Sequence, residues 1–195
     1  MTDRDQILNA IVAHQPTYSA LPQNFISAGD NNDLITQFTE TLTAIGGTVQ
    51  TVDNTDAINE YIKSKSITGQ RVISRVVGIT GHIEEAEVSL LPHELQNVHF
   101  AILQAHFGVA ENGAVWITEE LMGQRVLPFI CQHLIIALHA KDIVADMHEA
   151  YKRIGTNLFG FGTFIAGPSK TADIEQSLVL GAHGSRTMTV FLIRS

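Results

Sequence analysis

Many of the side chains in this sequence that could do chemistry together lie in one stretch, residues 162–184, which reads GTFIAGPSKTADIEQSLVLGAHG. An apolar run stops at a Gly-Pro pair, a small polar loop carries Lys170, and a Gly-Ala-His-Gly segment carries His183. The pattern predicts a strand followed by a helix, whose first amide groups are free for a side-chain cap or a bound anion. We therefore expect a binding site at this turn.

This loop combines a cation, two carboxylates and an imidazole. Lys170 could hold a carboxylate or phosphate by charge, and His183 could move a proton because its side chain titrates near neutral pH. In the alternative interpretation, Thr171 caps the helix, Asp173 and Glu175 stabilise its dipole, and the histidine is an ordinary loop residue. Both acids also repel an anion, so Lys170 would have to outweigh them.

A second glycine-bearing loop, GVAENG at residues 108–113, follows the apolar run HFAILQAHF. Its glycines could bring backbone amides close to a ligand, because they have no side chain in the way. Glu111 is either a turn residue or a carboxylate held at a strand end as an acid, base or ligand contact. We expect the two loops to meet in one cleft. The expected ligand-binding residues are Gly108, Gly113, Ser169, Lys170, Thr171, Asp173, Glu175 and Gly184, and the expected catalytic residues are Glu111 and His183.

Motifs for metals and redox cofactors are missing from the sequence. The nine histidines form neither H-E-x-x-H nor a compact cluster with cysteine, so we expect no metal site, although convergence in space stays open. An iron-sulfur cluster needs about four cysteine ligands, whereas Cys131 is the single cysteine and lies in an apolar run typical of a core. Gly160 and Gly162 begin a dinucleotide fingerprint, but Ile165 occupies the place of its third glycine. The cofactor, if any, stays unidentified.

The composition of the chain restricts the kinds of partner that we expect. The net charge is −8 and the lysines and arginines are scattered, which disfavours a nucleic-acid partner. The N-terminal residues MTDRDQILNAIVAH lack the apolar block and cleavage site of a signal peptide. No uninterrupted apolar run is long enough to cross a bilayer, so we expect a cytoplasmic protein without a membrane span.

The hydrophobic pattern alternates between helical and strand spacing. Helices are expected at residues 3–14, 34–45, 55–62 and 141–154, and strands at 48–52, 71–77, 99–104, 113–118, 133–138, 161–166 and 187–193. Two prolines bracket a connector after the first helix, so we expect a helical arm over residues 1–28 and an α/β domain over 29–195. Such alternation implies a largely parallel sheet covered by helices on both faces, with ligands beyond the carboxyl ends of the strands.

Both glycine-bearing loops also resemble the hallmarks of a known family. Residues 167–175 and 178–185 read GPSKTADIE and LVLGAHGS, and resemble GPSRTADIE and LVLGVHGP of the lactate-utilisation protein C family, whose members carry the LUD domain. Residues 108–115, GVAENGAV, resemble its hallmark GIAETGTL. The match runs in order over about residues 108–193 and departs at Lys170, Asn112 and Ser185, where the family pattern has Arg, Thr and Pro. Lysine lacks the bidentate geometry of arginine at an anion site.

The resemblance implies a Rossmann-like layered sheet, similar to the sugar-phosphate isomerase and coenzyme A transferase group. It further implies a non-redox component of a system that oxidises L-lactate to pyruvate, together with partner subunits that carry iron-sulfur clusters. A small carboxylate or phosphate is the expected ligand.

Other functions stay open, since one fold hosts many sites. The chain could be a stand-alone enzyme acting on a phosphorylated or acyl small molecule, which would turn over substrate without partners. It could also be a non-catalytic scaffold that docks through its N-terminal helix. The substrate, the electron acceptor and any homo-oligomeric state are not specified by the sequence.

Overall fold

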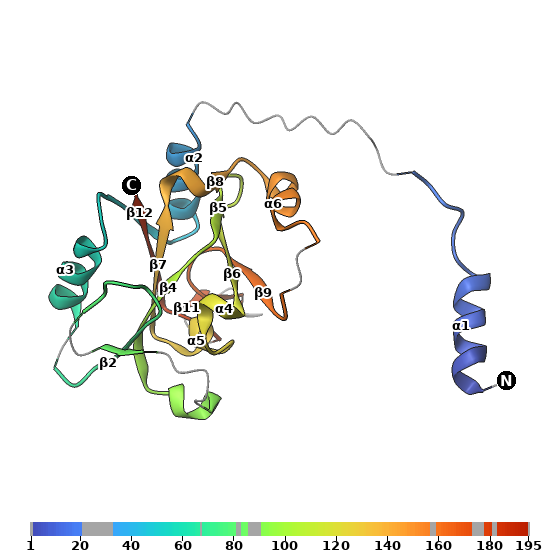
Figure 1. Ribbon diagram of the computed structural model, residues 1–195, viewed down its shortest axis with the longest axis horizontal. Helices are drawn as coiled ribbons and strands as arrows, with labels where there is room; N and C mark the ends of the chain where they lie inside the picture. The colour runs from blue at the N-terminus through green and yellow to red at the C-terminus, as the bar shows by residue number, and fades with distance from the viewer. Residues whose placement is uncertain are drawn as a thin grey trace.

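The computed structural model contains two packed sheets and a two-stranded ribbon, and the helices α2 (Leu34–Ala44) and α3 (Asp56–Lys65) lie against the larger sheet (Figure 1). It describes residues 2–20, 33–66, 68–80, 83–85, 91–156, 159–172, 178–180 and 183–194. The expected boundary between the arm and the α/β domain, at residues 28 and 29, lies outside these ranges. Within them, no helix is both long and apolar enough to cross a membrane.

A six-stranded parallel sheet forms the centre of the molecule, in the order β1-β12-β7-β4-β2-β3. The strands are β1 (Thr48–Val52), β2 (Arg71–Ser74), β3 (Ile83–Glu85), β4 (Val98–Gln104), β7 (His133–His139) and β12 (Thr187–Ile193). This sheet confirms the predicted Rossmann-like α/β class. The bounds of β1 and β12 are those expected from the sequence, whereas β2 ends three residues earlier than predicted.

Alternate residues of β2, β4, β7 and β12 pack into cores on opposite faces of the sheet. In β7, Leu134, Ile136 and Leu138 join one core, and Ile135 and Ala137 join the other. Two helices provide the facing residues: α2 (Leu34–Ala44) contributes Phe38 and Leu42 to the first core, and α3 (Asp56–Lys65) contributes Ile58 and Ile62 to the second. The near-continuous apolar runs of these strands follow from burial on both faces.

A smaller sheet, ordered β8-β5-β6-β9, packs beside the central one. Its strands are β5 (Phe107–Val109), β6 (Ala114–Thr118), β8 (Ile143–Val144) and β9 (Gly162–Ile165). An aromatic cluster of Phe107, Trp116 and Phe164 lies on it, against Ala150 of α6 (Met147–Ile154). The short helices α4 (Glu119–Met122) and α5 (Leu127–Ile130) follow β6. The expected strand at residues 113–118 therefore pairs with β5 and β9.

The first helix, α1 (Asp3–Ala13), is confirmed as predicted. Its N-terminus has a capping box, in which the Asp5 amide donates to the Thr2 hydroxyl and the Thr2 amide donates to the Asp5 carboxylate. None of its residues is buried, so its apolar side chains, including Ile7 and Val12, face solvent.

The late helix is shorter than the sequence predicts. The predicted helix over residues 141–154 is wrong in its first half, where Ile143–Val144 forms β8 and pairs in parallel with β5. Both residues are β-branched, which favours a strand. The helix begins only at Met147, after Asp146, whose carboxylate accepts a hydrogen bond of 2.8 Å from the Glu149 amide.

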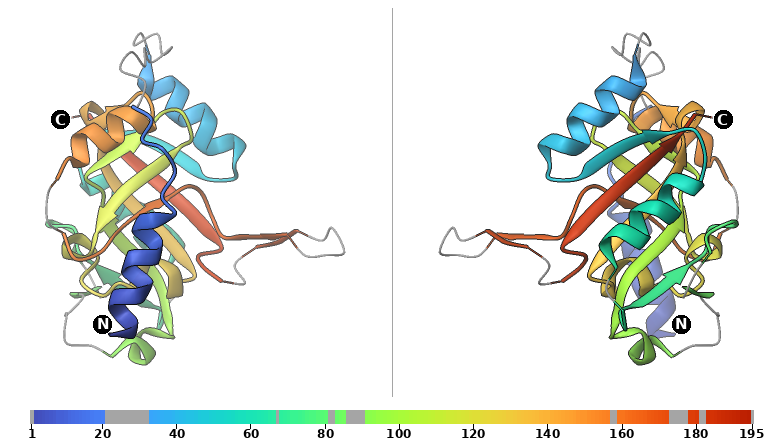
Figure 2. Two further views of the ribbon diagram at one scale, coloured as in Figure 1. Left: turned by 90° about the vertical axis from the view of Figure 1, so that its right-hand side faces the viewer. Right: turned by 90° about the vertical axis from the view of Figure 1, so that its left-hand side faces the viewer.

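The helix predicted after Gly167-Pro168 is also wrong. Residues 170–172 form β10 (Lys170–Ala172), which pairs antiparallel with β11 (Leu178–Leu180). Figure 2 shows this two-stranded ribbon projecting from the body of the molecule. Gly167 has a φ of 75° and turns the chain into the ribbon, a conformation that glycine adopts without a steric penalty. Among the described residues 167–172 and 178–180, no helix N-terminus is available for an anion, and residues 173–177 of the predicted helix lie outside the described residues.

Candidate functional site

The glycines of the 108–113 loop hold the smaller sheet against α2. A Cβ atom at Gly108 would lie 2.9 Å from Phe38 Cε2, and one at Gly113 would lie 2.9 Å from the backbone N and Cα of Leu42. Gly113 has a φ of 67°, and its amide donates to the Val109 carbonyl. These two glycines therefore have a packing role, because any side chain would push α2 away.

Glu111 lies in the same turn and contacts α6. Its Oε2 accepts a hydrogen bond of 3.0 Å from the Met147 amide, which is one of the free amides at the N-terminus of that helix. The Glu111 amide donates in turn to the Ala145 carbonyl. The exposed carboxylate of Glu111 thus has a structural partner in the helix.

A pair of variants separates a capping role of Glu111 from a chemical one. Glu111→Ala removes the acceptor for the Met147 amide, and we expect it to lower the free energy of unfolding by about 1 kcal/mol. Glu111→Gln keeps an acceptor oxygen, so its urea unfolding midpoint should stay close to that of the wild type. A loss of function in Glu111→Gln at unchanged stability would show that the charge itself is needed.

The segments around Ser169 and Gly184 form a corner at the amino-terminal edge of the central sheet. The Ser169 amide donates to the Ser185 carbonyl at 2.9 Å, and a Cβ atom at Gly184 would lie 3.0 Å from Ser169 Cβ. The exposed Lys170 side chain lies beside Gly46, where an added Cβ would be 3.8 Å from its Nζ atom. Gly46 comes just before β1, and Ser185 just before β12, which places the corner where these strands begin.

His183 is exposed at the same edge and lines a hollow of about 390 Å³. Cys131 and Gln132, which precede β7, line this hollow as well. Burial raises the pKa of the Cys131 thiol to about 12, so it stays protonated at neutral pH and packs as an apolar group.

The predicted site residues thus have different surroundings. Ser169, Lys170 and Gly184 come together, and His183 directly precedes Gly184. Glu111 instead contacts the N-terminus of α6 on the smaller sheet. Of the remaining expected residues, Asp173 and Glu175 lie outside the described residues, as does the side chain of Thr171. A cleft shared by both loops stays a prediction.

The opposite edge of the central sheet holds a cavity of about 270 Å³. Residues at the carboxyl ends of the strands line it, among them Asn54, Thr55, Val77, Gln104, His139 and Ile193. Asn59, which is buried in α3, fixes the loop above it: its Nδ2 donates to the Gly78 carbonyl at 3.1 Å, and its Oδ1 accepts from the Thr80 amide at 3.0 Å. Ligands of parallel α/β sheets bind at this edge.

A third hollow, of about 300 Å³, opens on the smaller sheet and was not predicted from the sequence. It is lined by residues of several elements, among them His106, Trp116, Thr118, Glu120, Arg153 and Phe159. These residues span more than fifty positions of the chain without any regular spacing. No sequence motif could have indicated that they meet.

Comparison with known proteins places the chain in a family. Residues 82–193 match the family model described as the LUD domain. A lactate utilization protein C from Halalkalibacterium halodurans is 24% identical over 194 residues, which cover 87% of this chain and 84% of that protein. Another from Bacillus pumilus is 28% identical over 100 residues, or 48% of this chain, and the match spans only 42% of that relative.

A solved structure shares the fold. The crystal structure of a DUF162 family protein from Deinococcus radiodurans matches with a TM-score of 0.60 and 17% sequence identity, over 83% of this chain and 96% of the other. At this identity the likeness concerns the fold alone. Since the family model covers more than half of the sequence, the chain belongs to the LUD-domain family.

Proposed function

We propose that this protein takes part in lactate utilisation, as a cytoplasmic component of a system that oxidises L-lactate to pyruvate. The observation that carries the proposal is the likeness to the Halalkalibacterium halodurans protein named lactate utilization protein C, which extends over 87% of this chain and 84% of that one. Several further relatives with the same name match shorter stretches.

Partner subunits that carry iron-sulfur clusters would supply the electron transfer in this proposal. A cluster needs about four thiolate ligands, and this chain has one cysteine. The buried Cys131 is held protonated by its surroundings, which makes it a poor ligand. The chain would then contribute binding and positioning of a small acid.

The corner at Ser169 and Gly184 is our proposed place for that acid. Lys170 offers an exposed ammonium group that can hold a carboxylate by charge, and His183, next to Gly184, can accept or return a proton. Arg186 is exposed two residues after Gly184 and adds positive charge. The proposal leaves Glu111 out of this step, because its carboxylate contacts α6, and the catalytic role expected for it stays a prediction that Glu111→Gln tests.

Growth on L-lactate tests both the role in lactate utilisation and the proposed site. The source organism, with the gene for this protein deleted, should fail to grow on L-lactate as sole carbon source. Growth should recover when the gene for this chain is supplied. Lys170→Ala should reduce that recovery, because the carboxylate loses its charged partner, whereas Lys65→Ala at the end of α3 should not.

The role in lactate utilisation and the proposed site can be refuted independently. Growth of the deletion strain at the normal rate would refute the role in lactate utilisation. Full recovery with both Lys170→Ala and His183→Ala would refute the site alone, and a matching loss with Gln104→Leu would move the site to the carboxyl edge of the sheet.

A further inference from the structure

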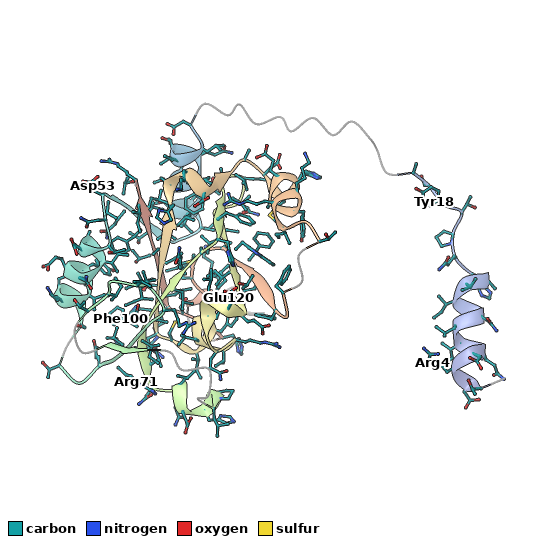
Figure 3. The ribbon with its side chains drawn as sticks, in the orientation of Figure 1. Arg4, Tyr18, Asp53, Arg71, Phe100 and Glu120 are labelled. Atoms are coloured by element: carbon teal, nitrogen blue, oxygen red, sulfur yellow. The ribbon has the colours of Figure 1, made fainter. Side chains whose placement is uncertain are left out.

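The hollow on the smaller sheet combines opposite charges with aromatic walls. His106 and Thr118 lie on one side, Glu120 of α4 and Arg153 of α6 lie at its rim, and Trp116 and Phe159 form its apolar wall. Glu120 is labelled in Figure 3, where it lies beside the smaller sheet. At about 300 Å³, the hollow is at the lower end of the range of ligand pockets, which suits a molecule of amino-acid size.

Contacts with the protein hold the Arg153 side chain and the backbone of Glu120 in place. Arg153 donates to Asp142 Oδ1 at 2.5 Å, and its guanidinium lies 5.1 Å from the centroid of the Phe107 ring. The backbone of Glu120 is tied down through its carbonyl, which accepts a hydrogen bond of 3.2 Å from Arg75. A ligand would therefore meet the fixed guanidinium of Arg153, which also pairs with Asp142, and the exposed carboxylate of Glu120, of which the backbone is held.

His106 adds a hydrogen-bonding group without adding a charge. Its Nε2 lies 2.8 Å from the Thr118 hydroxyl, and Thr118 itself is buried. Partial burial of the ring lowers the pKa of His106 below its ordinary value, and Arg153 lowers it further against the opposing effect of Glu120. The imidazole is therefore neutral at pH 7, and the charge of the lining comes from Glu120 and Arg153.

This balance discriminates between ligands. A simple carboxylate would bind Arg153 but face Glu120 as a like charge, and a simple amine would bind Glu120 but face Arg153. A ligand that carries both charges satisfies both residues. The wall suits an apolar substituent, because Trp116 and Phe159 meet edge to face with ring centroids 5.3 Å apart.

We infer that this hollow binds a small zwitterion, namely an α-amino acid with an apolar side chain. Its carboxylate would pair with Arg153, its ammonium group with Glu120, and its side chain would pack on Trp116 and Phe159. The inference goes beyond the proposed role in lactate utilisation and does not depend on it, since the hollow is on the smaller sheet and the Lys170 corner is at the edge of the central one.

The chain has a built-in probe for this hollow, because Trp116 is its single tryptophan. Titrating the purified chain with three ligands that share a 3-methylbutyl chain, while following tryptophan fluorescence, separates the contributions of the two charges. We expect L-leucine to bind roughly tenfold more tightly than 2-hydroxy-4-methylpentanoate or 3-methylbutylamine, because each of these lacks one charged contact. The melting temperature of the chain should rise more with L-leucine than with either of the other two ligands.

Two variants with matched controls test the roles of the charges. Glu120→Gln should abolish the preference for L-leucine over the hydroxy acid, and Arg153→Gln should abolish its preference over the amine. Glu60→Gln and Lys152→Gln remove the same charges at exposed positions outside the lining, and should leave both preferences intact. Circular dichroism establishes whether each variant is folded. If Arg153→Gln does not fold, Glu120→Gln alone still tests the inference.

The inference would be overturned by no change of fluorescence or melting temperature with any of the ligands, by equal binding of L-leucine and the hydroxy acid, or by an unchanged preference in Glu120→Gln. Binding of the hydroxy acid alone would overturn it while leaving the role in lactate utilisation untouched. Failure of the growth experiment, in turn, would leave this site standing.

Discussion

Replacing Gly113 by alanine should lower the free energy of unfolding by about 3 kcal/mol, which is a large effect for one methyl group. Two costs combine at this position. The backbone φ of 67° is unfavourable for any residue with a Cβ atom, and that atom would lie 2.9 Å from the backbone of Leu42. A helix backbone cannot rotate away as a side chain would, so α2 itself has to move.

Gly69→Ala is the matched control for this prediction. Gly69 has a comparable φ of 92°, but an added Cβ atom would meet nothing within 4 Å. We expect it to cost about 1 kcal/mol from the backbone alone. Thermal unfolding should then separate the two variants by several degrees, since about 1 kcal/mol shifts the melting temperature of a chain of this size by roughly 2–4 °C. Equal melting temperatures would refute the steric argument.

Phe38→Ala should have a comparable or larger effect, about 3–5 kcal/mol. Phe38 is fully buried between α2 and the sheets, and its ring lies against Gly108 of β5. Ile35→Ala, on the same helix but at a side chain that is 40% exposed, should cost about 1 kcal/mol or less. Urea unfolding of the two variants measures the difference directly.

The contact between Phe38 and Gly108 predicts that substitutions at these two positions are coupled, which urea unfolding can also test. An added Cβ at Gly108 would approach Phe38 Cε2 and Leu138 Cδ2, both at 2.9 Å. Gly108→Ala should therefore cost about 1 kcal/mol less in the Phe38→Ala background, where half of the obstruction is gone. Strict additivity of the two substitutions would show that β5 moves to relieve the clash.

Five of the six strands of the central sheet could be predicted, and β3 was not. The strand β12 is a nearly continuous apolar run, whereas β1 is a short run of mostly β-branched residues after a Gly-Gly pair, and the expected and observed bounds of both coincide. The errors came where local pattern and tertiary pairing compete. Ile143 and Val144 have helical spacing with the residues of α6, yet they pair with β5, and Lys170 continues from a turn into a ribbon.

The site was harder to predict than the fold. Sequence motifs led to Gly108 and Gly113, but the structure shows that both pack against α2, which is a reason for glycine that a motif does not reveal. The hollow around Trp116 combines residues from β6, from the start of β5, from α4 and α6, and from the loop before β9. Such a group depends on how helices dock on a sheet, and no spacing along the chain encodes it.

The position of β12 bears on how the protein is made. It is the last of the six central strands in chain order, yet it lies between β1 and β7 and pairs with both. While the ribosome still holds residues 187–193, the nascent chain has two unsatisfied strand edges and an open apolar core. The sheet can therefore close only after residues 187–193 have left the ribosome, and until then the exposed apolar core is a binding site for a chaperone.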